Sequence, residues 1–574
     1  MLLPVTPLIS AKHWSFAENP YVKIFNLHFM ARLKGSILTM FLISLPVLLY
    51  LVYVFSNATN TFFADDFHLL KTVVWVQEAN DLPTKLDLLV QQHNEHRILL
   101  PRLLTLLDYQ IEGTINWRTL VLLGSVVWAA NLWFFWQGFK HFRLPAWMFI
   151  AVPLIFLQPQ YADNTTWSIS ILQQSVIIFW FSLLSYLCAQ QKYTWALVVA
   201  IAATFTHGNG FFSFLIIILL AISDRKWKTV AVCAGIWAAV GLVYFWDFRT
   251  GQNADFGKSL SDPARLVMSF FAFFGSVTKI RTQNAYYAVS LGFLLATVLG
   301  VYIIPKLKVL FYKTGYQLSA FDKMLLGNIL FLGITGSLIA ISRSWLGIDG
   351  ILAPRYQHYS PYLICWAYVV LLSFFNLRYR KIAAAVVTVG AVAFNALSYF
   401  TYHEQVQLRK DGLIADESNW INHRTMIQYA RSFNDNIKGV YLEAVATGIC
   451  TVEDQFSNIV IADSPETDAN LRFGEATSYI IDTDGSYSQR FQSISNNHLT
   501  GTTYLFLQSG QQKGYWVPTR ILHSGIREFL SSGRLRKPGF HAEFLTENLP
   551  PADYRIGILN DGQFSWSSQR ILIK

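Results

Sequence analysis

Two adjacent carboxylic acids, Asp65 and Asp66, stand ten residues beyond the first long apolar run of the sequence. A carboxylate with a raised pKa can accept a proton from an attacking hydroxyl group. Alternatively, the pair can hold a divalent cation such as Mg²⁺, Mn²⁺ or Ca²⁺, which neutralises phosphate charge. The alternative without chemistry is that the pair caps a helix beginning near Phe67, because Asp is favoured there. We therefore treat both acids as candidate catalytic residues and as a candidate metal site.

The segment His93-Asn94-Glu95-His96-Arg97 is the densest polar cluster of the first 400 residues. His93 and His96 are three residues apart, so on a helix they would share one face and could bind hydroxyl groups or a metal. Glu95 is a candidate second acid, and Arg97 is a candidate phosphate ligand. The spacing is not the HExxH of zinc peptidases. The alternative is a solvated turn of a surface helix.

Arginine and tyrosine residues on the segment 342–362 are candidates for binding phosphate. Arg355 and Tyr356 precede a late apolar run, and Arg343 stands earlier on the same segment. The planar guanidinium group of arginine matches the geometry of phosphate oxygens. The alternative for each arginine is ordinary snorkelling at the end of a membrane helix. We expect at least two basic residues to face the acidic pair.

A polar break, His207-Gly208-Asn209-Gly210, interrupts an apolar stretch, and a short polar segment covers residues 158–167. Polar side chains beside aromatic rings are typical of sugar recognition, which uses hydrogen bonds to hydroxyl groups and stacking on ring faces. We therefore include His207 and Asn209 among the candidate substrate-binding residues. The second segment adds Gln158, Gln160, Tyr161, Asp163, Asn164 and Trp167.

The elements that must position these residues are membrane helices. The 574-residue chain is 53% hydrophobic and only 14% charged, whereas soluble domains are about 25% charged. This composition excludes a disordered chain and argues against a purely soluble enzyme. A bilayer crossing needs about 20 apolar residues. We expect eleven crossings, with 264–278 as a re-entrant or interfacial segment; the crossings are 35–55, 118–137, 144–158, 167–188, 194–208, 210–222, 229–246, 284–304, 324–341, 358–376 and 382–400.

Charge gives the expected orientation. Residues 1–400 carry a net charge of +13, and residues 401–574 carry −3. The basic excess therefore belongs to the membrane half, which argues against a nucleic acid partner. Short basic loops such as 137–143 and 305–313 are expected to be cytoplasmic. The N-terminus is then cytoplasmic, and the loop 56–117 lies on the opposite face.

The loop 56–117 holds eight of the 16 acids of the membrane half. Its leucines recur at helical spacing, which predicts amphipathic helices lying on the membrane surface. Such helices would hold Asp65 and Asp66 at the boundary between lipid and water.

Residues 401–574 are expected to form an extracytoplasmic domain with a β-sandwich-like fold. Short alternating runs separated by polar turns predict strands, and the sequence around Asn560-Asp561-Gly562 predicts a terminal strand pair with a tight turn. A helix is expected around 420–433. Two roles for this domain remain open: carbohydrate binding, and a structural lid over the active site. The predicted strands lie at 440–445, 458–463, 477–482, 503–508, 515–520, 554–559 and 570–574.

An acidic pair just after the first membrane helix, on a large outer loop with surface helices, resembles the GT-C glycosyltransferases. Protein mannosyltransferases, lipid A aminoarabinose transferases and arabinofuranosyltransferases share this plan. The resemblance implies transfer of a sugar from a polyprenyl-phosphate donor to a glycan, lipid or protein acceptor, with inversion. It also implies that Asp65 or Asp66 activates the acceptor hydroxyl, while an arginine, with or without a metal, stabilises the leaving phosphate. A bacterial inner membrane, with the C-terminal domain in the periplasm, is the implied location.

Two other classes remain open. A transporter or flippase of lipid-linked glycans would explain the many crossings and the break at His207–Gly210, but not the long first outer loop or the large outer domain. An O-antigen ligase or polymerase also uses lipid-linked glycans, although such proteins concentrate their chemistry in a late outer loop. Loss of sugar transfer on substituting Asp65 or Asp66 would separate these classes.

Overall fold

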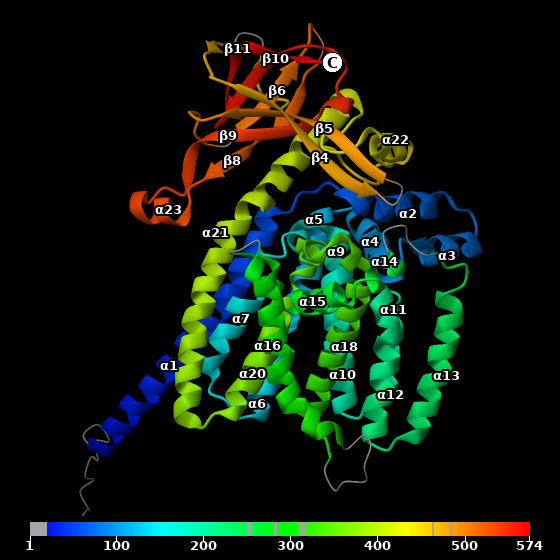
Figure 1. The fold of residues 1–574 in the computed structure, drawn as a ribbon, viewed down its shortest axis with the longest axis vertical. Coiled ribbons are helices and arrows are strands. Elements are labelled where there is room, and N and C mark those ends of the chain that lie inside the picture. The colour runs from blue at the N-terminus through cyan, green and yellow to red at the C-terminus, as the bar shows by residue number, and fades with distance from the viewer. Residues whose placement is uncertain are drawn as a thin grey trace, which may run out of the picture.

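The structure is a computed structural model that describes residues 20–249, 255–280, 284–308, 317–461, 464–482, 485–501, 503–511 and 513–574, with side chains for all of these except 20–35 and 476–489. Two predictions fall partly outside the described residues. They are the cytoplasmic N-terminus, of which residues 1–19 are not described, and the basic loop 305–313, of which residues 309–313 are not described. The described chain forms a bundle of long helices with a β-rich region at one end (Figure 1). The expected combination of a helical body and a C-terminal β region is confirmed.

The helical body contains, within the described residues, seven helical stretches that are long and apolar enough to cross a membrane. They are formed by α1 (Pro20–Asn57), α5 (Trp117–Ala130) with α6 (Leu132–His141), α9 (Ser168–Ser170) with η3 (Ile171–Ser175) and α10 (Val176–Ala189), α13 (Trp227–Tyr244), α16 (Ala285–Ile303), α18 (Ala320–Arg343) and α21 (Leu377–His423).

Four other predicted crossings correspond to shorter helices: α7 (Ala151–Phe156) preceded by a 3₁₀ turn, α11 (Tyr193–Thr204), α12 (Ser213–Ser223) and α20 (Tyr359–Phe374). The α11–α12 pair is short because a 3₁₀ turn, η4 (Gly208–Phe212), separates the two helices. The uncertain segment 264–278 contains α15 (Pro263–Phe274). A helix of this length rises about 18 Å, which is less than the about 30 Å of a bilayer core.

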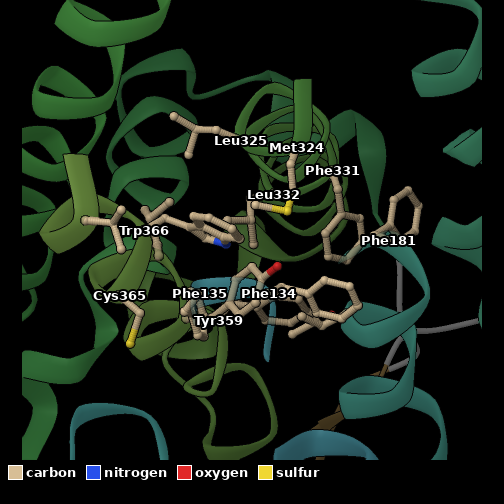
Figure 2. Packing of buried hydrophobic residues seen from close by; sticks show 14 of the residues in the cluster. Phe134, Phe135, Phe181, Met324, Leu325, Phe331, Leu332, Tyr359, Cys365 and Trp366 are labelled. Carbon is tan, nitrogen blue, oxygen red and sulfur yellow. The ribbon is translucent and has the colours of Figure 1, made fainter. Parts of the chain in front are cut away.

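The centre of the bundle is a single large apolar cluster to which α6, α7, α10, α11, α12, α18 and α20 contribute. Figure 2 shows the part of it formed by α6, α10, α18 and α20. The rings of Phe181 and Phe331 stack with centroids 3.9 Å apart, and Trp366 meets Phe135 edge to face at 4.9 Å. Rigid packing of this kind fixes how the helices sit against one another. The ends of these helices therefore present side chains in a defined arrangement.

Glycines bring α15 and α16 into direct backbone contact. A Cβ atom added at Gly292 would lie 1.8 Å from the carbonyl oxygen of Phe271, and one added at Gly275 would lie 1.9 Å from that of Ala288. Small residues at such crossings let membrane helices approach closely.

The loop 56–117 lies across the end of the bundle, between the helices and the β region (Figure 1). The predicted helices are confirmed as α2 (Phe67–Glu78), α3 (Leu82–Val90) and α4 (Leu99–Glu112). The expectation that His93 and His96 share a helix face is wrong. Strands β1 (Gln92–His93) and β2 (His96–Arg97) form an antiparallel hairpin. Asn94 turns it with φ 48°, a conformation that asparagine tolerates better than most residues.

The helix α21 runs without a break through the predicted domain boundary at residues 400–401. It ends at His423, where Arg424 adopts a left-handed conformation, and α22 (Arg431–Ala446) then begins. The single helix predicted around 420–433 is therefore wrong. The strand predicted at 440–445 is also wrong, because this run belongs to α22, whose buried residues include Ile437, Tyr441 and Ala444 at helical spacing.

Two sheets form the β region. One has the order β3 (Glu466–Thr467), β11 (Gln563–Ile573), β10 (Ala552–Asn560), β6 (Thr503–Gln508), β7 (Tyr515–Pro518), and the other β4 (Arg472–Asp482), β5 (Gly485–Asn496), β9 (Arg536–Leu545), β8 (Arg520–His523). Alternate residues of both sheets share one buried cluster, as in a sandwich.

The predicted terminal hairpin is confirmed. Asn560 pairs with Gln563 across the turn, and Asp561 and Gly562 both have positive φ, 47° and 82°. This is the geometry of the tight turn that an Asp-Gly pair favours between antiparallel strands. The strand predicted at 458–463 is wrong for its described part, residues 458–461, which has no regular secondary structure.

We predict that Gly292→Ala destabilises the protein, because the new methyl group forces α15 away from α16. Gly333→Ala in α18 is the matched control, since a Cβ there meets no atom within 4 Å. The expected loss for Gly292→Ala is about 2 kcal/mol, measured as a lower thermal unfolding midpoint of the detergent-solubilised protein. Equal midpoints for the two variants would contradict the close contact.

Candidate active site

A cavity of about 310 Å³ lies beneath the surface helices, where the bundle meets the loop 56–117. Five segments far apart in the sequence line it: the turn η1 (Ala64–Asp66), the β1–β2 hairpin, the start of the helix through 167–174, the end of α18 and the turn η8 (Pro354–Tyr356). The lining residues are Asp65, His93, Asn94, Glu95, His96, Trp167, Ile169, Ser170, Gln173, Gln174, Arg343, Leu346, Arg355 and Tyr356.

A second pocket of about 190 Å³ adjoins this cavity and shares part of its wall. The shared residues are Glu95, His96, Gln174, Arg343 and Tyr356, and the second pocket adds His207, Asn209, Phe256, Leu338, Ile339 and Ser342. The second pocket is more apolar because α18 contributes leucine and isoleucine side chains.

Most of the residues singled out in the sequence meet here. Seven of them line the main cavity, namely Asp65, His93, Glu95, His96, Arg343, Arg355 and Tyr356. His207 and Asn209 line the adjoining pocket. Asp66 and Arg97 line neither. Of the polar residues at 158–167, Trp167 lines the cavity, whereas Gln158, Gln160, Tyr161 and Asn164 are fully buried among other protein groups.

Asp66 is buried and holds the backbone together. Its carboxylate accepts hydrogen bonds from the backbone N–H of Ile169 at 2.6 Å and of Phe63 at 3.1 Å. Burial raises its pKa to about 7, although both hydrogen bonds act in the opposite direction. Asp66 therefore joins the turn after α1 to the start of the helix that leads into η3.

Asp65 occupies a different environment although it is the next residue. Its side chain is half-buried at the wall of the cavity. Among the described residues, none donates a hydrogen bond to its carboxylate. Burial raises its pKa, and the positive charge of Arg355 lowers it. Asp65 is thus the member of the pair that can exchange a proton with a molecule in the cavity.

Two guanidinium groups complete the charged wall. Arg343 ends α18, and Arg355 lies on η8 with its guanidinium 5.1 Å from the centre of the Tyr356 ring. Both arginines line the same cavity as Asp65. Two such groups suit a phosphate, which accepts several charge-assisted hydrogen bonds.

Arg97 has a structural role. Its guanidinium donates hydrogen bonds to the carbonyl oxygens of Tyr244, at 2.7 Å, and Val90, at 2.8 Å, and also to that of Trp246. These bonds tie the β1–β2 hairpin to the end of α13 and of α3. Arg97 therefore fixes the position of His93 and His96 and does not face the cavity.

The histidines on the hairpin pack against other histidines. The His93 ring lies 4.4 Å from that of His68, and the His96 ring lies 4.1 Å from that of His207, measured between centroids. Burial lowers the pKa of His93 to about 2 and that of His68 to about 4. Both rings are therefore neutral near pH 7 and suited to hydrogen bonding with hydroxyl groups.

The two aspartates do not present their carboxylates together to the cavity. Only Asp65 of the acidic pair faces the cavity, because the Asp66 carboxylate is engaged by backbone N–H groups. Within the part of the chain that the structure describes, no group of three or more His, Cys, Asp or Glu side chains is placed to hold a metal ion.

A π-helical turn contributes residues that were not singled out in the sequence. In η3 (Ile171–Ser175) the wider turn carries Gln173 and Gln174 to the cavity wall. The Nε2 atoms of Gln174 and His207 lie 3.1 Å apart. The backbone carbonyl oxygen of Gln174 accepts a hydrogen bond from Nε2 of His358 at 2.8 Å. π-helical turns occur frequently at functional sites. The available signal was the pair of glutamines inside an otherwise apolar run.

Three cavity residues carry a buried polar atom with no hydrogen-bond partner in the described protein. These atoms are Nδ1 of His93, Nε1 of Trp167 and Nε2 of Gln173. An unpaired buried polar group costs about 1–3 kcal/mol. A ligand with several hydroxyl groups can remove part of this cost after small side-chain rotations.

We predict that titration of Asp66 makes the free energy of unfolding depend on pH, and that Asp66→Asn removes this contribution. The pKa of Asp66 is raised from 3.8 to about 7 on folding, so the folded protein binds more protons than the unfolded one between these values. The free energy of unfolding should therefore fall as the pH rises through this window. The difference between wild type and Asp66→Asn should show this slope in thermal unfolding at pH 4.5–8. A pH-independent difference would contradict the raised pKa.

Comparisons of the chain with protein-family models, with curated proteins and with solved structures find no match. The cavity itself combines one carboxylate without a hydrogen bond from the described residues, two guanidinium groups and several uncharged polar side chains, at the end of a bundle of apolar helices.

Proposed function

We propose that the protein is an integral membrane glycosyltransferase of the GT-C type. It transfers a sugar from a polyprenyl-phosphate donor to an acceptor hydroxyl on the extracytoplasmic face of the membrane. The observation that carries this proposal is the cavity in which Asp65 shares a wall with Arg343 and Arg355. A base for a hydroxyl and two cations for a phosphate are the groups that such a transfer needs.

In the proposed reaction, Asp65 accepts the proton of the acceptor hydroxyl while the hydroxyl oxygen attacks the anomeric carbon of the sugar. The bond between that carbon and the phosphate oxygen breaks, and its electron pair stays on the polyprenyl phosphate. Attack from the face opposite the leaving group inverts the anomeric configuration. Arg343 and Arg355 stabilise the negative charge that develops on the phosphate.

The neutral side chains of the cavity are proposed to bind the sugar. His93, Trp167 and Gln173 line the cavity, and each has a buried polar atom that the described protein does not pair. The apolar wall of the adjoining pocket, formed by Leu338 and Ile339 of α18, suits the first isoprene units of the lipid. A divalent cation is not required by this assignment and remains a candidate that a chelation assay can test.

The proposed topology has eleven crossings, made by the seven long apolar stretches and the four shorter segments that contain α7, α11, α12 and α20. The N-terminus would be cytoplasmic, and the loop 56–117 and the β region would be periplasmic. The buried ion pair between Lys323 and Asp224 would lie near the cytoplasmic ends of α18 and α12. An odd number of crossings is needed to put the β region on the side of the cavity.

We predict that Asp65→Asn lowers kcat about 100-fold or more, because general-base catalysis contributes that much. The assay uses full-length protein in liposomes with a panel of radiolabelled undecaprenyl-phosphate hexoses and pentoses and extracted envelope acceptors. Asp87→Asn, an exposed acid-to-amide change on the same loop, is the matched control and should keep full activity. Full activity of Asp65→Asn would refute the mechanism, and lipid-linked sugar transport without transfer would favour a flippase.

We predict that Arg355→Gln moves the acidic limb of the pH profile of kcat to higher pH. The charge of Arg355 lowers the pKa of Asp65, so its removal raises that pKa, and the base is protonated at a higher pH. Arg343→Gln is the control, with a smaller shift expected. An acidic limb that stays in place in Arg355→Gln would show that Asp65 is not the titrating base.

A further inference from the structure

The turn that carries Asp65 has an unfavourable backbone conformation. Ala64, the residue immediately before it, has φ 47°. A residue with a Cβ atom is disfavoured in this left-handed region. Such a conformation persists only where the surroundings hold it, and it is often found beside functional groups.

A tyrosine from the C-terminal part of the chain holds Ala64 directly. The backbone N–H of Ala64 donates a hydrogen bond to the hydroxyl oxygen of Tyr429 at 3.2 Å. The preceding residue, Phe63, lies beneath the guanidinium of Arg409 at 4.4 Å and meets the Trp167 ring edge to face at 5.2 Å. Two of these contacts, Tyr429 and Arg409, come from residues more than 340 positions later in the sequence.

Tyr429 is in turn fixed by the β region. Its carbonyl oxygen accepts a hydrogen bond from Asn548, in the turn η9 (Thr546–Asn548), at 2.5 Å. Its ring stacks on Phe433 of α22 with centroids 4.6 Å apart. The neighbouring backbone N–H of Arg431 donates to Glu547 at 2.9 Å. Contacts therefore run without a gap from the β sandwich through Tyr429 to the turn.

We propose that Tyr429 is a positioning residue for Asp65, and that the C-terminal region serves to hold the strained turn so that this carboxylate faces the cavity. The proposal rests on the catalytic role proposed for Asp65. Its physical basis is that a displacement of about 1 Å of a reacting group can cost on the order of 100-fold in rate. Without the hydroxyl of Tyr429, Ala64 can relax toward negative φ and turn Asp65 away.

The first test is Tyr429→Phe in the full-length protein, with two measurements. Hydrogen exchange of the amides of residues 62–66, followed by mass spectrometry, should become at least about tenfold faster, because the Ala64 N–H loses its acceptor. In the liposome transfer assay, kcat should fall about tenfold, while KM for the donor changes less than about twofold. Tyr515→Phe is the matched control, since no described residue makes a hydrogen bond to that hydroxyl.

The second test is rescue by Ala64→Gly. Glycine adopts positive φ without a steric cost, so the double variant Tyr429→Phe/Ala64→Gly should recover at least about half of the lost kcat. A double variant no more active than Tyr429→Phe would overturn the role of the strained turn. If Tyr429→Phe does not fold, Asn548→Ala replaces it, because Asn548 donates the hydrogen bond to the Tyr429 carbonyl oxygen. This variant should also speed exchange at residues 62–66 and lower kcat.

The outcomes separate this inference from the proposed function. Unchanged exchange at residues 62–66 in Tyr429→Phe overturns the positioning role, whether or not the protein transfers a sugar. Faster exchange with unchanged kcat also overturns it. If wild-type protein shows no transfer with any donor, the proposed function fails, and the exchange measurement alone then decides whether Tyr429 holds the turn.

Discussion

The buried carboxylate of Asp66 accepts hydrogen bonds from two backbone N–H groups, one on the turn after α1 and one at Ile169. These bonds join the first outer loop to the helix that contains η3. Asp65 and the glutamines of η3 line one cavity because this junction brings their backbones together. Without it, the turn that carries Asp65 would lose its direct hydrogen bond to the segment that leads into η3.

Arginines in this protein have two distinct uses. Arg97 donates to backbone carbonyl oxygens and thereby holds the β1–β2 hairpin. Arg102 of α4 donates to the carbonyl oxygen of Leu89 at the end of α3, and Arg409 pairs with Asp163 and covers Phe63. Arg343 and Arg355 line the cavity. The difference follows from the neighbourhood. Arg97 lies among carbonyl oxygens at the ends of α3 and α13, whereas Arg355 lies beside a polar cavity, where a guanidinium can meet an anionic ligand.

Much of the fold could be predicted from the sequence. The hydrophobic runs located the long helices, because an apolar stretch of about 20 residues has few other stable arrangements, and an Asp-Gly pair located the last hairpin, because few other dipeptides tolerate two positive φ angles. Most residues of the candidate site could be found because charged residues are scarce in the first 400 residues. An ionisable side chain within a membrane protein costs free energy, so its presence indicates a function. The end of α21 at His423 and the helical conformation of 440–445 were not predicted. For 440–445 the reason is that a run this short fits both the alternation of a strand and the periodicity of a helix.

The order of residues along the chain is enough to show which side chains are polar within an apolar body, and so which ones could do chemistry. Only the folded chain shows which of the two adjacent aspartates faces the cavity, that His93 and His96 are paired positions of a hairpin, and that Gln173 and Gln174 reach the cavity through a π-helical turn. The physical reason is that hydrophobicity is a property of each residue, whereas the direction of a side chain depends on hydrogen bonds made by backbone more than 100 residues away, such as those of Ile169 to Asp66 and Ala64 to Tyr429.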